Sequence, residues 1–178
     1  PEDLGGLDDR RLWPFYEKAC ELDIALTVHT GMSYVVPQPS CHTHPDRLDQ
    51  VLLDFPELKI IAYHMGWPHT EELIGLAGKH TNLYLSMSGI IGWYARSPYR
   101  GYHAIGTALQ WVEPHKIVMG LDLTFDDMKR VVDWVRTLQI PEELREQYGY
   151  LEITEEMRKG FLGTNLARLA KIEPNKRV

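Results

Sequence analysis

The stretch KIIAYHMGWPHTEELIGLAGK, residues 59–79, contains in order an apolar strand, a polar turn and an amphipathic helix. Residues 59–63 form a short apolar run that is typical of a strand buried on both faces. Pro68 precedes a helical pattern over residues 70–79, and proline is well tolerated at a helix start because it has no N–H to lose there. His64 directly follows the strand. The stretch therefore predicts one β-α unit with a histidine at the carboxyl end of its strand.

The same alternation recurs along the chain. Buried strands are also expected at residues 24–28, 83–87 and 116–120, and helices at 12–22, 46–55, 102–112, 126–138 and 154–169. Residues 139–152 are interpreted as a charged surface insertion. Because strand-helix-strand connections are right-handed and pair strands in parallel, the fold class is α/β, either a doubly wound sheet or a closed barrel.

The composition limits the kinds of partner. With 178 residues, 44% hydrophobic and 25% charged, we expect residues 1–178 to form a single domain. A formal net charge of -6 without a long basic run argues against binding to nucleic acid, so we expect a small-molecule partner. No apolar run reaches the roughly 20 residues of a membrane helix. Cys20 and Cys41 form no disulfide or zinc pattern, so we expect a cytoplasmic protein.

Three of the expected strands end in a residue that can bind a metal. His29, His64 and Asp122 each follow an apolar run and lie close to a glycine. The carboxyl ends of parallel strands meet at one edge of a sheet, where two histidines and an aspartate would make a usual ligand set for zinc. Alone, such a histidine often only bonds a backbone carbonyl and such an aspartate often caps a helix. Their coincidence favours a site, in which His64 would transfer protons.

A second histidine pair is interpreted as part of a loop. His42 and His44, within Cys41-His42-Thr43-His44, have the spacing of two ligands on one strand face. Prolines surround the pair and no apolar strand contains it, so the segment is expected to be a loop ahead of the 46–55 helix. Loops over a barrel mouth can still contribute ligands, which leaves that alternative open.

Substrate-binding residues are expected after the second and third strands. Trp67 follows the His64 turn and would form a pocket wall. Residues 91–100 are expected to be a loop that mixes aromatic side chains with Arg96. This loop would either clamp an aromatic or carboxylated substrate or pack against helices or a subunit partner.

Several motifs occur together in a fixed order. They are VHTG at residues 28–31, LLDFPELKIIAYHMG at 52–66, NLYLS at 82–86, GLD at 120–122 and GTNLARL at 163–169. This ordered set resembles the amidohydrolase 2 family of barrel proteins, which includes the aminocarboxymuconate-semialdehyde and resorcylate decarboxylases. The resemblance extends over residues 13–172.

The resemblance implies a TIM-like (β/α)8 barrel with one divalent metal ion, zinc or else manganese. It implies that His29 is a metal ligand on the fifth strand, His64 an acid/base residue on the sixth, and Asp122 a ligand on the eighth that also takes part in catalysis. The implied function is that of a metal-dependent hydrolase or nonoxidative decarboxylase acting on a small carboxylated, aromatic or unsaturated, substrate.

Two departures from the family pattern affect these expectations. The His-x-His of the family's first strand has no counterpart in place, so the chain is expected to cover the last four βα units, without the N-terminal part of the barrel. Half a barrel leaves unpaired sheet edges, so we expect a homo-oligomer or a complementing barrel half. The family also commonly has Ser or Thr before the eighth-strand Asp and Pro two residues after it, where this chain has Leu121 and Thr124.

Two other functions are considered. The chain could be a noncatalytic barrel half that serves as a scaffold subunit, because a fold does not dictate an activity. A flavodoxin-like binding domain is disfavoured, since no glycine-rich phosphate loop opens any expected helix.

Overall fold

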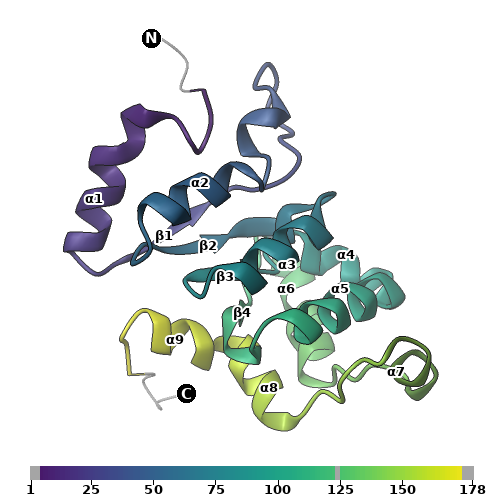
Figure 1. Cartoon of the computed structure of the whole chain (residues 1–178). Helices are drawn as coiled ribbons and strands as arrows, with labels where there is room; N and C mark the ends of the chain where they lie inside the picture. Colours follow the sequence, from purple (N-terminus) through teal and green to yellow (C-terminus); the bar gives the residue numbers. More distant parts are fainter. Residues whose placement is uncertain (1–4, 123–124, 174–178) are drawn as a thin grey trace. The chain divides into compact units, whose positions relative to one another are not determined.

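The computed structural model of the protein describes residues 5–122 and 125–173, which form an α/β fold (Figure 1). The chain divides into two compact units, Pro1–Leu85 and Ser86–Val178. The predicted alternation of strands and helices is confirmed in both units, with most boundaries within a few residues of those expected from the sequence.

The first unit contains three parallel strands and the helices between them. Its elements are α1 (Trp13–Glu21), β1 (Ala25–Val28), α2 (Arg47–Asp54), β2 (Lys59–Ala62), α3 (Thr70–Lys79) and the start of β3 (Leu83–Ser86). Ala25 of β1 is in register with Lys59 of β2, and Ile60 of β2 with Leu83 of β3. The parallel arrangement places the carboxyl ends of β1 and β2 at the same edge of the sheet.

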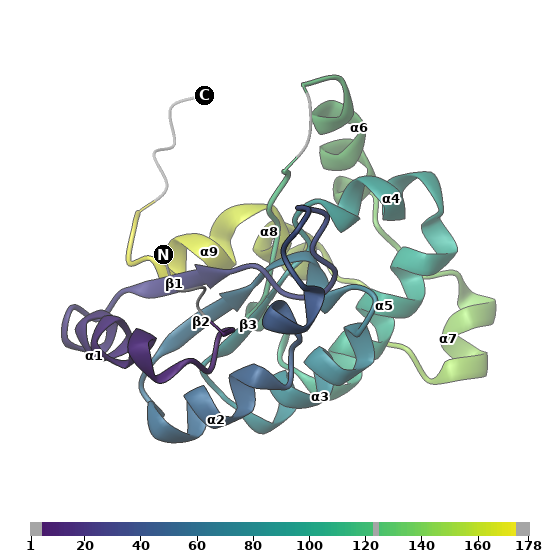
Figure 2. The same cartoon turned by 90° about the horizontal axis from the view of Figure 1, so that it is seen from above.

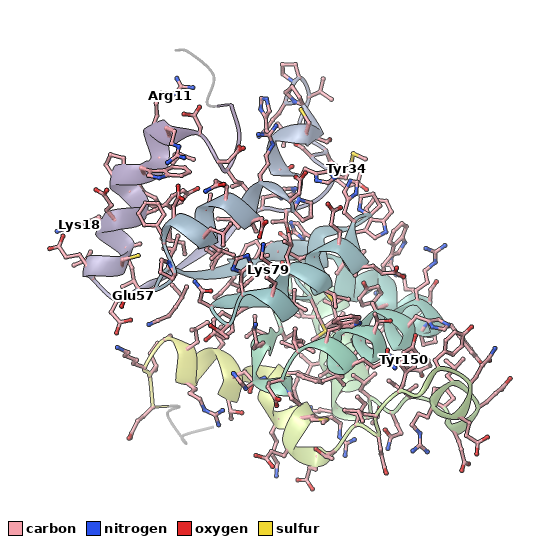
Figure 3. All side chains as sticks on the ribbon, viewed as in Figure 1. Arg11, Lys18, Tyr34, Glu57, Lys79 and Tyr150 are labelled. Carbon is pink, nitrogen blue, oxygen red and sulfur yellow. The ribbon has the colours of Figure 1, made fainter. Side chains whose placement is uncertain are left out.

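The apolar faces of α2 and α3 form much of the core of this unit. Residues at helical spacing on each helix are buried, namely Leu48, Val51, Leu52, Leu73, Ile74 and Ala77. The two helices lie next to each other (Figure 2). Asp49 of α2 accepts hydrogen bonds of 2.6 Å from Lys79 Nζ and from His80 Nε2 at the end of α3, where Figure 3 labels Lys79.

The prediction that every strand is buried on both faces is wrong for β1. None of the four residues of β1 is buried, and Thr27 is exposed, whereas Ile60, Ile61 and Ala62 of β2 are all buried. The physical reason is position in the sheet. β1 is an edge strand, so it is shielded by a neighbouring strand on one side, while β2 has a strand on each side.

The second unit holds most of the helices. Its elements are α4 (Ile90–Arg96), α5 (Pro98–Trp111), β4 (Ile117–Val118), α6 (Phe125–Arg136), α7 (Glu142–Tyr148), α8 (Glu155–Lys159), a π-helix (Gly160–Thr164) and α9 (Asn165–Leu169). β4 lies beside the segment that continues β3, because Met87 N–H donates to the Val118 carbonyl at 3.0 Å and Gly89 N–H to the Leu121 carbonyl at 3.0 Å.

Two expectations about helices in the second unit are wrong. Residues 91–100 are not a loop: all but Ser97 belong to α4 and α5, because Ile90, Ile91 and Tyr94 have a helical spacing and are buried. The helix expected over residues 154–169 is interrupted by a π-helical turn between α8 and α9.

The region 139–152 is more than a charged surface insertion. It contains α7 and places the buried Tyr150 against α5 (Figure 3). The Tyr150 hydroxyl lies 2.9 Å from His103 Nδ1, and a Cβ added to Gly106 would lie only 2.6 Å from the Tyr150 ring. His103 and Tyr150 thus join α5 to the segment after α7.

The helices of residues 5–122 and 125–173 include none that is both long enough and apolar enough to cross a membrane.

Candidate metal and proton-transfer site

The structure brings together His29 and His64, the two histidines predicted at the ends of β1 and β2. His64 Nε2 lies 3.1 Å from His29 Nδ1, and the two ring centroids are 4.6 Å apart with an edge-to-face angle of 64°. His29 is exposed and His64 is half-buried. Two imidazoles at the carboxyl ends of neighbouring strands therefore share one small region that remains accessible to a ligand.

The hydrogen bonds of His29 identify its candidate ligand atom. His29 Nε2 lies 3.1 Å from the Met32 carbonyl oxygen, which can only accept a hydrogen bond, so Nε2 is the donor. In the neutral imidazole Nδ1 then carries the lone pair. Histidines that bind metals commonly donate their other ring N–H to a backbone carbonyl in this way. His29 Nδ1 is therefore the candidate ligand atom, and the role of His29 as a ligand stays a prediction.

The turns that follow β1 and β2 are locked to each other. Thr30 Oγ1 donates to the Tyr63 carbonyl at 2.6 Å, and Met32 N–H donates to the Trp67 carbonyl at 2.8 Å. Gly31, between them, has φ +92°, and a Cβ at this position would lie 2.0 Å from the Trp67 carbonyl oxygen. Only glycine allows this close approach of the two turns, which fixes where the two imidazoles lie.

The backbone of His64 adopts the left-handed conformation, with φ 61° and ψ 19°, and Met65 and Gly66 continue it with φ 46° and 66°. Such conformations cost of the order of 1 kcal/mol or more for residues other than glycine, and they cluster at functional sites. Asp122, in the second unit, is also left-handed, with φ 49°. Two of the three residues predicted for the site therefore have a backbone conformation that is uncommon for residues other than glycine; Asp23 and Lys171, outside the site, have it too.

The remaining predicted residues are placed as follows. Asp122 follows β4 in the second unit and is exposed, while Arg96 is the exposed last residue of α4 in the same unit. Trp67 follows the His64 turn in the first unit and is half-buried. Thr124, one of the two departures from the family pattern, lies outside the described residues. The roles of Asp122, Arg96 and Trp67 stay predictions.

A further cluster of metal-capable side chains was not predicted. His44 Nε2 and His69 Nδ1 each lie 3.7 Å from Glu72 Oε2. The segment 41–44 is mostly a short 3-10 helix, and His44 follows it, whereas His42 is not part of the cluster. The spacing of His69 and Glu72, three residues apart at the start of a helix, was the sequence signal that could have indicated a shared face.

The family model described as Amidohydrolase (Amidohydro_2) matches residues 1–171. A TIM-barrel protein from Bordetella bronchiseptica is 26% identical with a TM-score of 0.66, and the match covers 92% of this chain and 51% of that one. No curated protein matches the sequence.

Two decarboxylase structures have the same fold. The 5-carboxyvanillate decarboxylase of Sphingomonas paucimobilis is 18% identical with a TM-score of 0.61, and the match covers 94% of this chain and 55% of that one. The dihydroxybenzoic acid decarboxylase of Polaromonas sp. JS666, solved with bound manganese and the inhibitor 2-nitroresorcinol, is 20% identical with a TM-score of 0.62, over 93% of this chain and 55% of that one.

The chain thus spans about half the length of these three structures. The prediction of a partial TIM-like barrel is confirmed by the parallel sheet and by these neighbours. The family model covers nearly the whole chain, so the resemblance noted from the ordered motifs is also confirmed. The chain belongs to the Amidohydrolase (Amidohydro_2) family.

Proposed function

We propose that the protein acts in the nonoxidative decarboxylation of a small aromatic or unsaturated carboxylic acid at one divalent metal ion. The observation that carries this proposal is the His29–His64 pair, which places a candidate metal ligand and a candidate proton donor 3.1 Å apart at the ends of β1 and β2. The names of two structural neighbours, decarboxylases of carboxyvanillate and dihydroxybenzoic acid, suggest the substrate class.

In this proposal the metal is held by His29 Nδ1 and Asp122. Zinc suits nitrogen and carboxylate ligands, and manganese is the alternative, since one neighbour contains it. When bound, the ion supplies Lewis-acid polarisation of a substrate oxygen. The Met32 carbonyl, through its bond to His29 Nε2, keeps the imidazole in the orientation and tautomer that present Nδ1.

His64 supplies the proton. During decarboxylation the bond between the substrate carbon and its carboxylate breaks, carbon dioxide leaves, and the electron pair remains on that carbon, which must then gain a proton. His64 Nε2 faces a neutral Nδ1 lone pair in the present arrangement and so carries a hydrogen that can be transferred. Asp122 assists this transfer, Trp67 forms a wall of the substrate pocket and Arg96 pairs with the substrate carboxylate.

Hydrolysis is the second candidate, favoured by the description of the matching family. In that reaction His64 accepts a proton from the attacking water and returns it to the leaving group. We also propose a cytoplasmic location, supported by two free cysteines, Cys20 and Cys41. Assembly with a second copy or with a complementing barrel half is proposed because β1 is an edge strand.

The test is metal analysis and turnover of the intact protein. Carbon dioxide release is measured on dihydroxybenzoates and carboxyvanillate with zinc or manganese, and ester and amide hydrolysis on matched substrates. We expect turnover with one class, and loss of one metal ion and of turnover in His29→Asn. Unchanged metal content and turnover in His29→Asn would contradict the proposal. A protein that holds no metal dependent on His29 and turns over neither class would instead be a scaffold subunit.

A further inference from the structure

We propose that His44, His69 and Glu72 form a zinc-binding site that uses neither His29 nor His64. The three residues each offer one ligand atom, and these atoms all lie within 4.8 Å of one another. Two nitrogens and one carboxylate oxygen are a ligand set that zinc uses with a fourth position open to water. The proposal is independent of the proposed function.

The separations between the atoms suit a shared cation better than direct bonds. Glu72 Oε2 lies 3.7 Å from both His44 Nε2 and His69 Nδ1, which is beyond the usual 2.7–3.2 Å of a hydrogen bond. Ligands about 2.0–2.1 Å from a tetrahedral zinc are about 3.4 Å apart, so small side-chain rotations would complete the site. The two imidazole rings already lie 4.0 Å apart between centroids.

The tautomer of His44 is set for metal binding. His44 Nδ1 lies 2.7 Å from Asp46 Oδ1, and an ionised carboxylate only accepts, so Nδ1 is the donor. In the neutral ring Nε2 then carries a lone pair, which faces the Glu72 carboxylate. Two electron-rich groups that face each other without a hydrogen between them repel, and a cation removes that repulsion. The carboxylate–histidine arrangement is also the one that commonly orients zinc-bound imidazoles.

Two segments supply the ligands. His44 lies three residues before α2, whereas His69 is the residue before α3 and Glu72 lies in its first turn. The side chains of His44, His69 and Glu72 are 28%, 38% and 40% exposed, so an ion can reach them from solvent.

Zinc here would act as a clamp on the loop that positions His29. Thr43, next to His44, accepts a hydrogen bond at its carbonyl from Gly31 N–H at 2.8 Å and donates from Oγ1 to the Gly31 carbonyl at 2.7 Å. Joining His44 to the start of α3 therefore restrains the turn after β1 as well. The expected role is structural stabilisation.

The experiment is a zinc titration of the intact protein after removal of metal by a chelator, followed by calorimetry and by native mass spectrometry. We expect His69→Ala and Glu72→Gln to bind one zinc fewer per chain, or to bind it at least about 100-fold more weakly. Asp46→Ala should weaken binding about 10–100-fold, because it removes only the orienting partner of His44. Added zinc should also raise the melting temperature of the wild type more than that of Glu72→Gln.

His42→Ala is the matched control, since His42 is two residues from His44 but outside the cluster; it should bind zinc as the wild type does. His29→Asn separates the two proposals, because it should retain this zinc while losing the metal of the proposed active site. Glu72 is exposed, so its substitution should not prevent folding even if that of His44 does. Wild-type zinc stoichiometry and affinity in both His69→Ala and Glu72→Gln would overturn the proposal.

Discussion

His64 Nε2 and His29 Nδ1 lie 3.1 Å apart, and the Met32 carbonyl on the far side of the His29 ring makes Nδ1 the acceptor of this pair. The lone pair that accepts the hydrogen bond from His64 is the same one that would bind a metal. The two interactions compete, so occupation of Nδ1 would release the His64 N–H toward a substrate.

Substitution of each histidine should separate metal binding from proton transfer. His29→Asn removes the Nδ1 ligand, so we expect loss of one metal ion and of turnover. His64→Asn preserves the left-handed backbone, because asparagine adopts it readily, and should retain the metal while lowering kcat about 10²–10⁴-fold. Metal analysis and steady-state kinetics provide the readout. Equal loss of metal in both variants would show that His64 is itself a ligand.

Gly31→Ala should destabilise the protein by about 2–4 kcal/mol, because the added Cβ would lie 2.0 Å from the Trp67 carbonyl oxygen at a φ of +92°. Gly75→Ala is the control. Gly75 lies within α3, and no atom lies within 4 Å of its added Cβ, so alanine there should stabilise by about 0.5–1 kcal/mol. Urea unfolding measures both, and equal effects of the two substitutions would contradict the packing of the turns.

Lys116 should make stability depend on alkaline pH. Burial lowers the pKa of Lys116 to about 8, below the roughly 10.4 of an exposed lysine. Between these values the unfolded chain holds more protons than the folded one, so the free energy of unfolding rises with pH. Lys116→Met should reduce this pH dependence and raise the free energy of unfolding at pH 7 by about 1–3 kcal/mol. Lys129→Met, on an exposed side chain, should leave the rise in place.

Asn165 joins α9 to the start of β4. Its buried Nδ2 donates to the carbonyls of Pro114 and Ile117 at 2.9 and 2.8 Å. Asn165→Leu leaves these acceptors without that donor and should cost about 1–3 kcal/mol in urea unfolding. Leu166→Ala, on a side chain that is partly exposed, should cost less than about 1 kcal/mol. If Asn165→Leu lowered the free energy of unfolding as little as Leu166→Ala does, water would be replacing the hydrogen bonds of Asn165.

The local pattern of apolar residues was enough to predict the strands and helices that hold the candidate site residues. The helix expected over residues 70–79 is observed with those bounds, since its apolar spacing and the preceding proline act within one segment. The meeting of His29 and His64 followed from parallel pairing alone. By contrast, Thr27 is exposed because β1 lies at the edge of the sheet. The residues of β1 themselves do not determine that position.

The cluster of His44, His69 and Glu72 could not be predicted for a related reason. His44 is separated from His69 by helix α2, strand β2 and a left-handed turn. Their meeting depends on backbone angles at His64 and Met65 that apolar periodicity does not report. The prediction of a loop over residues 91–100 was wrong for a different reason. The aromatic and arginine side chains of this segment suggested a surface loop, whereas Tyr94 is buried at a helical spacing from Ile90.

The left-handed turn at His64 also determines what a saturation library at this position would show. Selection for folding alone should enrich glycine, asparagine, aspartate and histidine, the residues that tolerate a φ of 61°. Selection for turnover should then retain histidine alone. Comparing the residues that survive each selection would separate the requirement for a left-handed backbone at position 64 from the requirement for a proton-transferring side chain there.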